Sequence, residues 1–401
     1  MVGNKLRFLC PYTGKGRLAR LLQPLAIVGS VHPMKVSALV STYKSERFFR
    51  GCLDDLTGQT LFRSHSLEVV VVVSGSPENE EGIAREYQSH FPDQITILVT
   101  EREPMYVAWN RAIEVAKGEY LTNANTDDRH RGDALEVIAS FLDKHQGVQL
   151  AYGNCYVSKV ENETFEMNPK TQTYLYPRFF APNAALCYQF GPQPMWRKMI
   201  HREMGVFSVA LRAAGDYDFN LRFAARFKAQ RIDGPPTGTY LAHAGAISFK
   251  DDTIGNETER LYAQFRSPES IEAFYKAEGL KLDSRQQRSQ ALADFGVRAI
   301  QYYPPWFEGR PHSDIHLAHQ FFTMALGLDP ANESAANNLA LCEVLLGNTE
   351  RAMQVLAGLS ERQAKENLII LKNNPDQIGN LSIIPSGLPF PSQHSLTFEG
   401  L

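Results

Sequence analysis

The amino-acid sequence predicts an α/β fold, in which a twisted, mostly parallel sheet is flanked by helices and followed by a small α-helical segment. Two patterns indicate this fold. From residue 36 to residue 153, short β-prone apolar segments alternate with segments of helical period. Such alternation is typical of β–α–β units joined by right-handed crossovers. Beyond residue 312, apolar and small residues recur at helical spacing.

The elements can be assigned in order from the N-terminus. Residues 36–42 alternate and are β-prone, and Ser45 can cap the helix that follows, because its hydroxyl can accept a hydrogen bond from the first turn. Residues 69–73 are an unbroken valine run, typical of a strand buried on both faces of a parallel sheet. The next predicted elements are an acidic helix start at 78–81, a strand at 95–99, a helix at 105–117 closed by Gly118 as its C-cap, a strand at 119–122, a helix at 134–142 and a strand at 148–153.

Residues 155–250 are less regular. Aromatic and proline residues at 174–182 are expected to wall a substrate cleft. Residues 191–197 are expected to lead into a helix, and a second helix is expected to begin at Gly215. An irregular strand over 235–245 is expected to end at His243.

The bulk composition fits a soluble globular protein of two or three domains. The chain has 401 residues, of which 43% are hydrophobic and 21% charged, and its formal net charge of -3 gives no basis for nucleic-acid binding. The five cysteines are scattered, and none pairs at metal-ligand spacing. No apolar run approaches the roughly 18–20 residues that span a bilayer. These features predict a cytoplasmic protein, with peripheral association to the inner face of the membrane as the alternative.

The chain is expected to divide into five segments. Residues 1–33 carry basic residues and no acid, and Met34 would serve equally well as a start, so this extension is left undetermined. The remaining segments are an α/β domain at 34–265, a helical linker at 266–312, tetratricopeptide-like helices at 313–375 and a proline-containing tail at 376–401.

The helices expected at 313–375 resemble a tetratricopeptide helix pair. Small and apolar residues fit one 34-residue frame over about one and a half repeats. Pro304 and Pro305 interrupt the upstream helix, and at least three repeats are normally needed for a free-standing array. The segment is therefore expected to pack on the α/β domain or on another subunit. A structural role, a protein partner and self-association all remain open. The residues that fit the frame are Ala318, Phe322, Ala325, Leu326, Leu339, Ala340 and Ala352.

The most informative stretch is the Asn-Ala-Asn-Thr-Asp-Asp sequence of residues 123–128. It follows a strand, and acids at the carboxyl end of a strand lie where open α/β sheets bind ligands. Asp127 and Asp128 offer hard oxygen ligands, which suit a Mg²⁺ or Mn²⁺ ion that also binds substrate phosphates. An acidic turn without function is the alternative, because Asp favours turns.

Six motifs in order resemble a family 2 glycosyltransferase of the GT-A fold, over roughly residues 35–249. Each motif is weak alone, but their order and intervals are specific. They are Thr42-Tyr43 after the first strand, Ser74-Gly75-Ser76 after the valine strand, Ala108-Trp109-Asn110-Arg111, the acidic sequence ending in Asp127-Asp128 with Gly215-Asp216 after it, and His243-Ala244-Gly245.

The resemblance implies a nucleotide-sugar donor, with a UDP-sugar expected, a divalent Mg²⁺ or Mn²⁺ and transfer to an acceptor hydroxyl of a glycan, a lipid-linked substrate or a protein. Asp216 would be the general base, although it can also be read as a helix N-cap. Asp218 is expected to be structural. The metal ligands would be Asp127, Asp128 and His243, and the donor-binding residues Thr42, Tyr43, Ser74, Arg102, Tyr106, Asn110, Asn125 and Asp127.

The chain also departs from the family pattern. Asn125 replaces the first acid of the metal motif, Gly215 replaces a Glu, and Val73 and Ser74 stand where an acid commonly ends the second strand. The Gln-x-x-Arg-Trp motif of processive synthases is missing, so single, inverting additions are expected. A degenerate scaffold is one alternative. A sugar-phosphate nucleotidyltransferase is another, although no glycine-rich loop follows the first strand.

Overall fold

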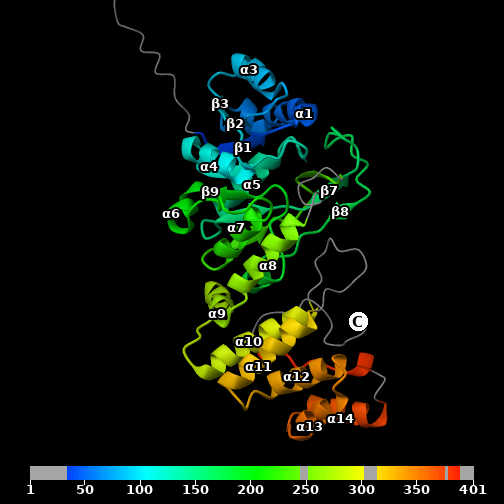
Figure 1. Cartoon of the computed structure of the whole chain (residues 1–401). Coiled ribbons are helices and arrows are strands. Elements are labelled where there is room, and N and C mark those ends of the chain that lie inside the picture. The colour runs from blue at the N-terminus through cyan, green and yellow to red at the C-terminus, as the bar shows by residue number, and fades with distance from the viewer. Residues whose placement is uncertain (1–33, 244–251, 302–313, 375–377, 389–401) are drawn as a thin grey trace, which may run out of the picture. The chain divides into compact units, whose positions relative to one another are not determined.

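The structure is a computed structural model that describes residues 34–243, 252–301, 314–374 and 378–388 (Figure 1). The predicted extension at 1–33, Pro304 and Pro305, and much of the predicted tail lie outside these residues. The predicted α/β fold with a helical C-terminal region is confirmed. In Figure 1 the elements run from blue near the N-terminus, through green, to orange and red in the C-terminal helices.

The larger sheet is mostly parallel, as predicted. Within the described residues, its strands in spatial order are β10 (Ala229–Arg231), β6 (Leu150–Tyr152), β9 (Met195–Arg197), β4 (Tyr120–Asn123), β1 (Val36–Thr42), β2 (Leu67–Ser74) and β3 (Ile95–Thr100). β1 pairs in parallel with β2 and with β4, so Thr42 lies opposite Val73 and Leu39 opposite Asn123. The carboxyl ends of these three strands therefore meet at one edge of the sheet.

Helices cover both faces of this sheet, which explains the valine run in β2. Val69 and Val71 belong to one core, together with α1 (Glu46–Thr57), α3 (Glu80–His90) and α5 (Ala134–Lys144). Val70 and Val72 belong to a second core on α4 (Met105–Val115). Because successive strand residues point to opposite faces, the run of five valines at 69–73 stabilises both cores at once. Each fully buried valine contributes roughly 1.5–3 kcal/mol.

A smaller sheet lies beside the acidic sequence. Its order in the described chain is β5 (Arg129–His130), β11 (Gly238–Leu241), β7 (Cys155–Ser158) and β8 (Thr173–Tyr174). β11 is antiparallel to β5, with Thr239 opposite Arg129. This pairing carries the residues that follow β11 to the acidic loop.

The structure departs from the local predictions at three places. Ser45 is the N-cap residue of α1, but its side chain makes no capping hydrogen bond. The helix expected to reach Lys117 ends at Val115, and its C-cap is Ala116, not Gly118. The Gly118 N–H instead donates to Ser37 Oγ (2.8 Å), and a Cβ on Gly118 would lie only 2.6 Å from the Ser37 nitrogen, so glycine is needed for close packing against β1.

Residues 191–197 lead into helical segments, as expected, but the strand at their end was not predicted. Residues Met195–Arg197 form strand β9, antiparallel to β4 and β6. A short turn, η2 (Lys198–Ile200), and α6 (His201–Met204) follow it. The backbone pairing of β9 with strands distant in sequence decided its structure, which a local pattern does not reveal.

The C-terminal region is helical, as expected. Its helices share one core, in which the ring centroids of Phe295 and Phe321 lie 4.6 Å apart. No helix in the described segments is both long and apolar enough to cross a membrane. After α7 (Gly215–Ala224), the helices are α8 (Thr253–Phe265), α9 (Pro268–Ala277), α10 (Arg285–Gln301), α11 (Ile315–Leu328), α12 (Glu333–Leu345), α13 (Thr349–Ala357) and α14 (Arg362–Asn373).

Candidate active site

A cleft of about 2060 Å³ lies at the edge where β1, β2 and β4 end. Thr42, Ser74 and Asn123 line it from the strand ends, while Asp216 and Thr258 line it from α7 and α8. A pocket for one drug-sized ligand has roughly 300–1,000 Å³. The cleft therefore has room for two substrates together, at the position where open α/β sheets bind ligands.

The acidic loop owes its shape to Arg129. This guanidinium is buried and donates from Nη1 to the carbonyl oxygens of Thr126 (2.8 Å) and Asp128 (2.6 Å). Its Nη2 donates to Asn162 Oδ1 (2.7 Å). Because the arginine ties the main chain on both sides of Asp127, that carboxylate is held in a fixed turn.

Asp128 is buried and engaged on both oxygens. Oδ1 accepts from the Leu241 N–H (3.2 Å), and Oδ2 accepts from Asn125 Nδ2 (3.1 Å). Burial, followed by the charge of Asp127, raises the pKa of Asp128 above its ordinary value. Asp128 was predicted as a metal ligand, but the geometry gives it a different task, which is to fix the end of β11 against the acidic loop.

Asp127 meets His243 beside the cleft. Two residues beyond Leu241, His243 places Nε2 3.1 Å from Asp127 Oδ2, and its ring lies edge-on to Phe48 at 5.7 Å. Both side chains are partly exposed, Asp127 by 29% and His243 by 17%. The structure thus brings together two of the three predicted metal ligands.

These two side chains fit a divalent cation shared with a substrate. In the described parts of the chain, no group of three or more His, Cys, Asp and Glu side chains could hold a metal by itself. Mg²⁺ in phosphate-transfer sites is commonly bound through one or two carboxylates together with substrate phosphates. A carboxylate and an imidazole at the rim of a substrate cleft match that arrangement.

On the donor side, Tyr43 and Arg102 form a flat, cationic surface. The Arg102 guanidinium lies 3.7 Å from the centre of the Tyr43 ring, and Nζ of the neighbouring Lys44 lies 5.6 Å from the same centre. Tyr43 is 36% exposed, and both Tyr43 and Arg102 line the cleft. These two predicted donor residues are therefore in contact with each other and open to a ligand.

Ser74 and Thr42 also line the cleft, but their hydroxyls bind neighbouring loops. Ser74 Oγ accepts from the Glu103 N–H (2.8 Å) and donates to the Glu103 carbonyl (2.9 Å). Thr42 shares a hydrogen bond with Ser45 Oγ (2.7 Å), and buried Glu80 accepts from the Ser45 N–H (2.9 Å). Glu80, which the sequence suggested only as part of an acidic helix start, thus braces the loop after β1.

Tyr106 and Asn110 form hydrogen bonds with residues 207–216, and not with the loops on the donor side. The Tyr106 hydroxyl donates to Asp216 Oδ1 (3.2 Å) and to the Ala213 carbonyl (3.0 Å). The amide of Asn110 pairs with the main chain of Phe207, at 2.9 and 3.0 Å, and Asn110 does not line the cleft. Tyr106 lines the cleft beside Asp216, whereas Asn110 does not, and the donor contact predicted for both residues stays a prediction.

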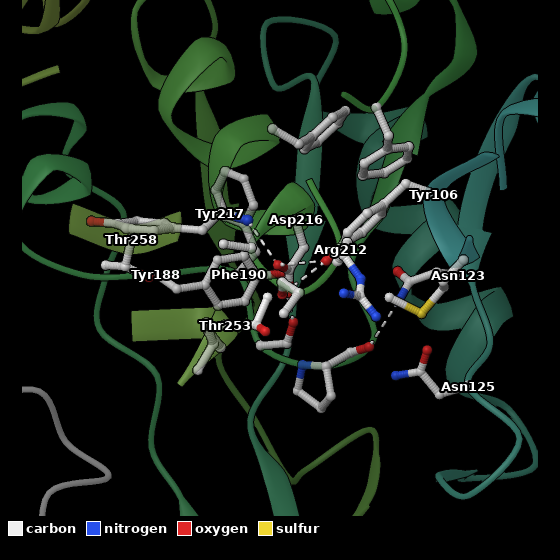
Figure 2. Close-up of a pocket in the computed structure, with 18 of the residues that line it drawn as sticks. Tyr106, Asn123, Asn125, Tyr188, Phe190, Arg212, Asp216, Tyr217, Thr253 and Thr258 are labelled. Atoms are coloured by element: carbon white, nitrogen blue, oxygen red, sulfur yellow. Dashed lines mark hydrogen bonds between the residues drawn. The ribbon is translucent and has the colours of Figure 1, made fainter. Parts of the chain in front are cut away.

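Asp216 lies in the first turn of α7, with Ala214 rather than Asp216 at the N-cap. Its Oδ1 accepts from the Tyr217 N–H (2.9 Å) and from Tyr106 (Figure 2). Burial raises the pKa of Asp216, while these two hydrogen bonds oppose the shift. A carboxyl with a raised pKa in a substrate cleft is a candidate acid–base group.

Gly215 explains how Tyr106 reaches Asp216. A Cβ at residue 215 would lie 2.5 Å from the Tyr106 ring. The Glu that the family pattern places here would therefore displace that ring. At this site the chain has Gly215 in place of the Glu, and the Tyr106 ring occupies the space next to Gly215 and donates to Asp216.

Glu257 of α8 holds the loop in front of Asp216. Its carboxylate accepts from the backbone N–H groups of Arg212 (2.8 Å), Ala213 (2.9 Å) and Ala214 (2.9 Å). Burial would raise the pKa of Glu257, but these bonds outweigh burial and lower it. No sequence pattern indicates this role, since Glu257 resembles any acid on an amphipathic helix.

Aromatic and hydroxyl side chains make the remaining wall of the cleft. Figure 2 shows Tyr188, Tyr217 and Thr258 on one side of Asp216, and Asn123 and Asn125 on the other. The Tyr217 hydroxyl donates to the Ala184 carbonyl (2.7 Å), which fixes its ring. A flat aromatic wall beside a candidate base suits the apolar face of a sugar ring.

Asp218 turns away from the cleft. It pairs with Arg222 one helical turn later (2.7 Å), and Arg222 Nη1 donates to the Met204 carbonyl (2.7 Å). The contact ties α7 to α6, in keeping with the structural role expected for Asp218.

Sequence comparison relates this chain to glycosyltransferases. The model of "Glycosyl transferase family 2" matches residues 37–212. A "PGL/p-HBAD biosynthesis glycosyltransferase" of Mycobacterium bovis is 24% identical over 190 residues, which cover 46% of this chain and 68% of the relative. A "Poly(ribitol-phosphate) beta-glucosyltransferase" of Bacillus spizizenii is 25% identical over 202 residues, but only 30% of its length is matched.

Among solved structures, residues 1–349 of S. aureus TarS in complex with UDP-GlcNAc are similar to this chain. The TM-score is 0.51 at 18% identity, covering 92% of this chain and 100% of that one. At this identity the likeness shows a shared fold.

Proposed function

The chain belongs to glycosyl transferase family 2 through residues 37–212, and from this premise we propose that it moves a sugar from a nucleotide-diphosphate sugar to an acceptor hydroxyl, with inversion at the anomeric carbon. It is a glycosyltransferase. The observation that carries the finer proposal is that Asp127 and Asp216 line one cleft, Asp127 beside His243 and Asp216 beside the aromatic wall.

The donor is proposed to bind at the ends of β1, β2 and β4. The exposed Tyr43 ring can stack on a nucleobase, and Arg102 beside it offers positive charge for phosphates. S. aureus TarS, which has a similar fold, was solved with UDP-GlcNAc, which favours a UDP-sugar as donor. Asn125 and Asp127 then face the diphosphate and sugar.

Asp127 and His243 are the proposed ligands of Mg²⁺ or Mn²⁺. When bound, the ion would neutralise the charge that develops on the departing diphosphate. Arg129 keeps Asp127 in place, and Asp128 keeps β11 and therefore His243 in place. Asp128 is left out of the proposed ligand set because both of its oxygens accept hydrogen bonds.

Asp216 is the proposed general base. The acceptor oxygen forms a bond to the anomeric carbon, and the bond from that carbon to the diphosphate breaks with its electron pair leaving on the diphosphate. The acceptor proton passes to Asp216, whose Oδ1 is held by Tyr106 and the Tyr217 N–H, so Oδ2 is the proposed proton acceptor. The single displacement inverts the configuration at the anomeric carbon.

A thermal-shift screen tests the donor proposal. The chain is heated with UDP-, GDP- and other nucleotide sugars, with and without Mn²⁺. A ligand at 100 times its Kd stabilises the folded state by about 2.7 kcal/mol, which raises Tm measurably. We expect a UDP-sugar to raise Tm more in the presence of Mn²⁺. If no nucleotide diphosphate raises Tm, the proposed donor site is wrong.

A further inference from the structure

Among the described residues, four arginines line the cleft, and three of them are already engaged by the protein. Arg47 forms an ion pair with an acid (3.0 Å). Arg102 and Arg266 each lie over a tyrosine ring and donate to a main-chain carbonyl. The fourth is Arg212, whose guanidinium makes no hydrogen bond or ion pair within the part of the chain that the structure describes. Its charge is therefore available to a ligand.

The main chain of Arg212 is fixed although its side chain is free. The Arg212 N–H donates to Glu257 Oε1 (2.8 Å), and the next two N–H groups bind the same carboxylate. The side chain is exposed but lines the cleft, and in the view of Figure 2 it lies between Asp216 and Asn123. A cation on a fixed stem is thus presented to the interior of the cleft.

The two neighbouring acids do not use this cation as a partner. Asp216 Oδ1 accepts from the Tyr106 hydroxyl and the Tyr217 N–H. Glu257 accepts from three main-chain N–H groups and not from the guanidinium. Since neither carboxylate is held by the Arg212 side chain, the position of the proposed base does not depend on it.

The chemistry of arginine indicates what this side chain would bind. A guanidinium presents a planar set of N–H donors that matches two oxygens of a phosphate or a carboxylate. A charge inside a cleft also attracts ions of opposite sign more strongly than the same charge on a flat surface. Arg212 is therefore suited to an oxyanion on a substrate.

Of the two substrates, the acceptor fits this position better than the donor. The phosphates of the proposed donor have Arg102 and the proposed metal ion at Asp127 and His243. Arg212 instead lies four residues before Asp216, on the loop that leads into α7. An acceptor whose hydroxyl reaches Asp216 would bring its neighbouring groups past this loop.

We propose that Arg212 is a specificity-determining residue that binds an anionic group of the acceptor, a phosphate or a carboxylate close to the reacting hydroxyl. This inference rests on the proposed function, because it takes Asp216 as the base. The acceptor class is a hydroxyl compound with a negative charge, which a sugar phosphate, a polyol phosphate and a uronic acid all provide.

The test measures binding of matched neutral and charged hydroxyl compounds by calorimetry. One series is a methyl glucoside, the same glucoside phosphorylated on its primary hydroxyl, and the corresponding glucuronide; the other is glycerol and glycerol phosphate. The full chain is saturated with UDP and Mn²⁺, so that the donor's phosphate positions are filled. A charged member should bind roughly ten- to hundredfold more tightly than its neutral counterpart. Added salt should reduce that preference.

Arg212→Gln removes the charge and should abolish the preference, while the affinity for UDP stays within a few-fold of wild type. Arg212→Lys keeps a positive charge without the planar donor set and should retain part of the preference. Arg202→Gln is the matched control, because Arg202 is exposed on α6 but does not line the cleft. It should leave every affinity unchanged.

Equal affinities within both series, including no binding at all, would overturn the proposal, as would a preference that survives Arg212→Gln. If Arg212→Gln weakens UDP tenfold or more, Arg212 is a donor ligand and the assignment to the acceptor is wrong. If circular dichroism shows that Arg212→Gln does not fold, Arg212 is a structural residue instead. Failure of the proposed function gives a different result, in which wild type itself binds no UDP or UDP-sugar.

Discussion

The two carboxylates proposed to act in the cleft are held in opposite ways. Asp127 is fixed by its own loop, because Arg129 two residues later binds the main chain on both sides of it. Asp216 is fixed by distant parts of the chain, through Tyr106 on α4 and through Glu257 on α8. The donor side of the cleft is thus built locally, whereas the base is held by contacts across the fold. Substitutions on the two sides should therefore differ in what they disturb.

The largest effect is expected from Asp216→Asn. The amide cannot accept the acceptor proton, so kcat should fall by about 10²–10⁴-fold. The donor lies on the other side of the cleft, so the Tm shift given by a UDP-sugar should persist. Transfer is measured with a UDP-sugar and an accepted hydroxyl substrate, and donor binding by thermal shift.

Asp218→Asn is the matched control for that change. It lies on the same helix but pairs with Arg222, so it should lower Tm and leave kcat within a few-fold of wild type. If Asp216→Asn keeps the kcat of wild type, Asp216 is not the general base, and the proposed difference between the two carboxylates is wrong. If that variant loses donor binding, Asp216 is a structural residue and not the base.

The second prediction is for the locally held carboxylate. Asp127→Ala removes the proposed anionic metal ligand and should lower transfer by about 10²–10³-fold, as expected for loss of one electrostatic stabiliser of the transition state. Unlike Asp216→Asn, it should abolish the part of the UDP-sugar Tm shift that depends on Mn²⁺. Calorimetric titration of UDP with and without Mn²⁺ measures the same difference.

Asp133→Ala is the control for Asp127→Ala, because Asp133 follows the same loop but pairs with Arg131 outside the cleft. It should leave the Mn²⁺-dependent shift intact. If Asp127→Ala keeps the Mn²⁺-dependent part of the Tm shift, Asp127 is not a metal ligand. The proposal that Asp216 is the base would not be affected.

The difference between local and long-range contacts also explains which features could be predicted from the sequence. The strands β1, β2 and β4 and the acidic loop follow from local patterns, and Tyr43 and Asp127, which come after two of these strands, line the cleft. Strand β9 and the contact of Tyr106 with Asp216 depend on residues about 70 to 110 positions apart. No spacing within one element encodes such a contact.

Glu257 and the segment at 381–388 fall in the same class. Glu257 looks like a solvated helix acid, and its task is visible only when the 212–214 backbone is folded beside it. The tail was expected to have no core of its own. Leu381 and Ile383 are instead buried in the core of the C-terminal helices. In both cases the partner atoms are main-chain groups or distant side chains, which leave no mark in sequence.

The third prediction concerns Glu257, which is proposed to position Asp216 without taking part in the chemical step. Glu257→Gln keeps the shape of the side chain but removes the charge that three N–H groups bind. A hydrogen bond to a charged group contributes roughly 1.5–3 kcal/mol, so Tm should fall by several degrees. Because Asp216 loses its support, kcat should fall by roughly tenfold, with the KM for the donor unchanged. Glu269→Gln, an exposed acid in the first turn of α9, should change neither quantity.

The pH dependence of stability gives a second measure of Glu257. Because the folded protein lowers the pKa of Glu257, its stabilising effect is present above the ordinary Glu pKa and is lost as pH falls through the folded value. Wild type should therefore lose more stability than Glu257→Gln between neutral and acid pH. Parallel losses in the two proteins would show that the carboxylate charge is not what holds the 212–214 loop.

The smallest expected effect, and the sharpest test of the contact across the fold, is from Tyr106→Phe. Transfer needs ionised Asp216, so activity falls as pH falls through the pKa of that carboxyl. Burial already raises this pKa, and the Tyr106 hydroxyl opposes the shift because it donates to the charged form. Phenylalanine keeps the ring that packs on Gly215 but removes the donor. The acid limb of the kcat profile should therefore move to higher pH, while the plateau rate at alkaline pH changes little. If the acid side of the kcat profile stays in place, or moves to lower pH, the group whose protonation lowers kcat is not Asp216.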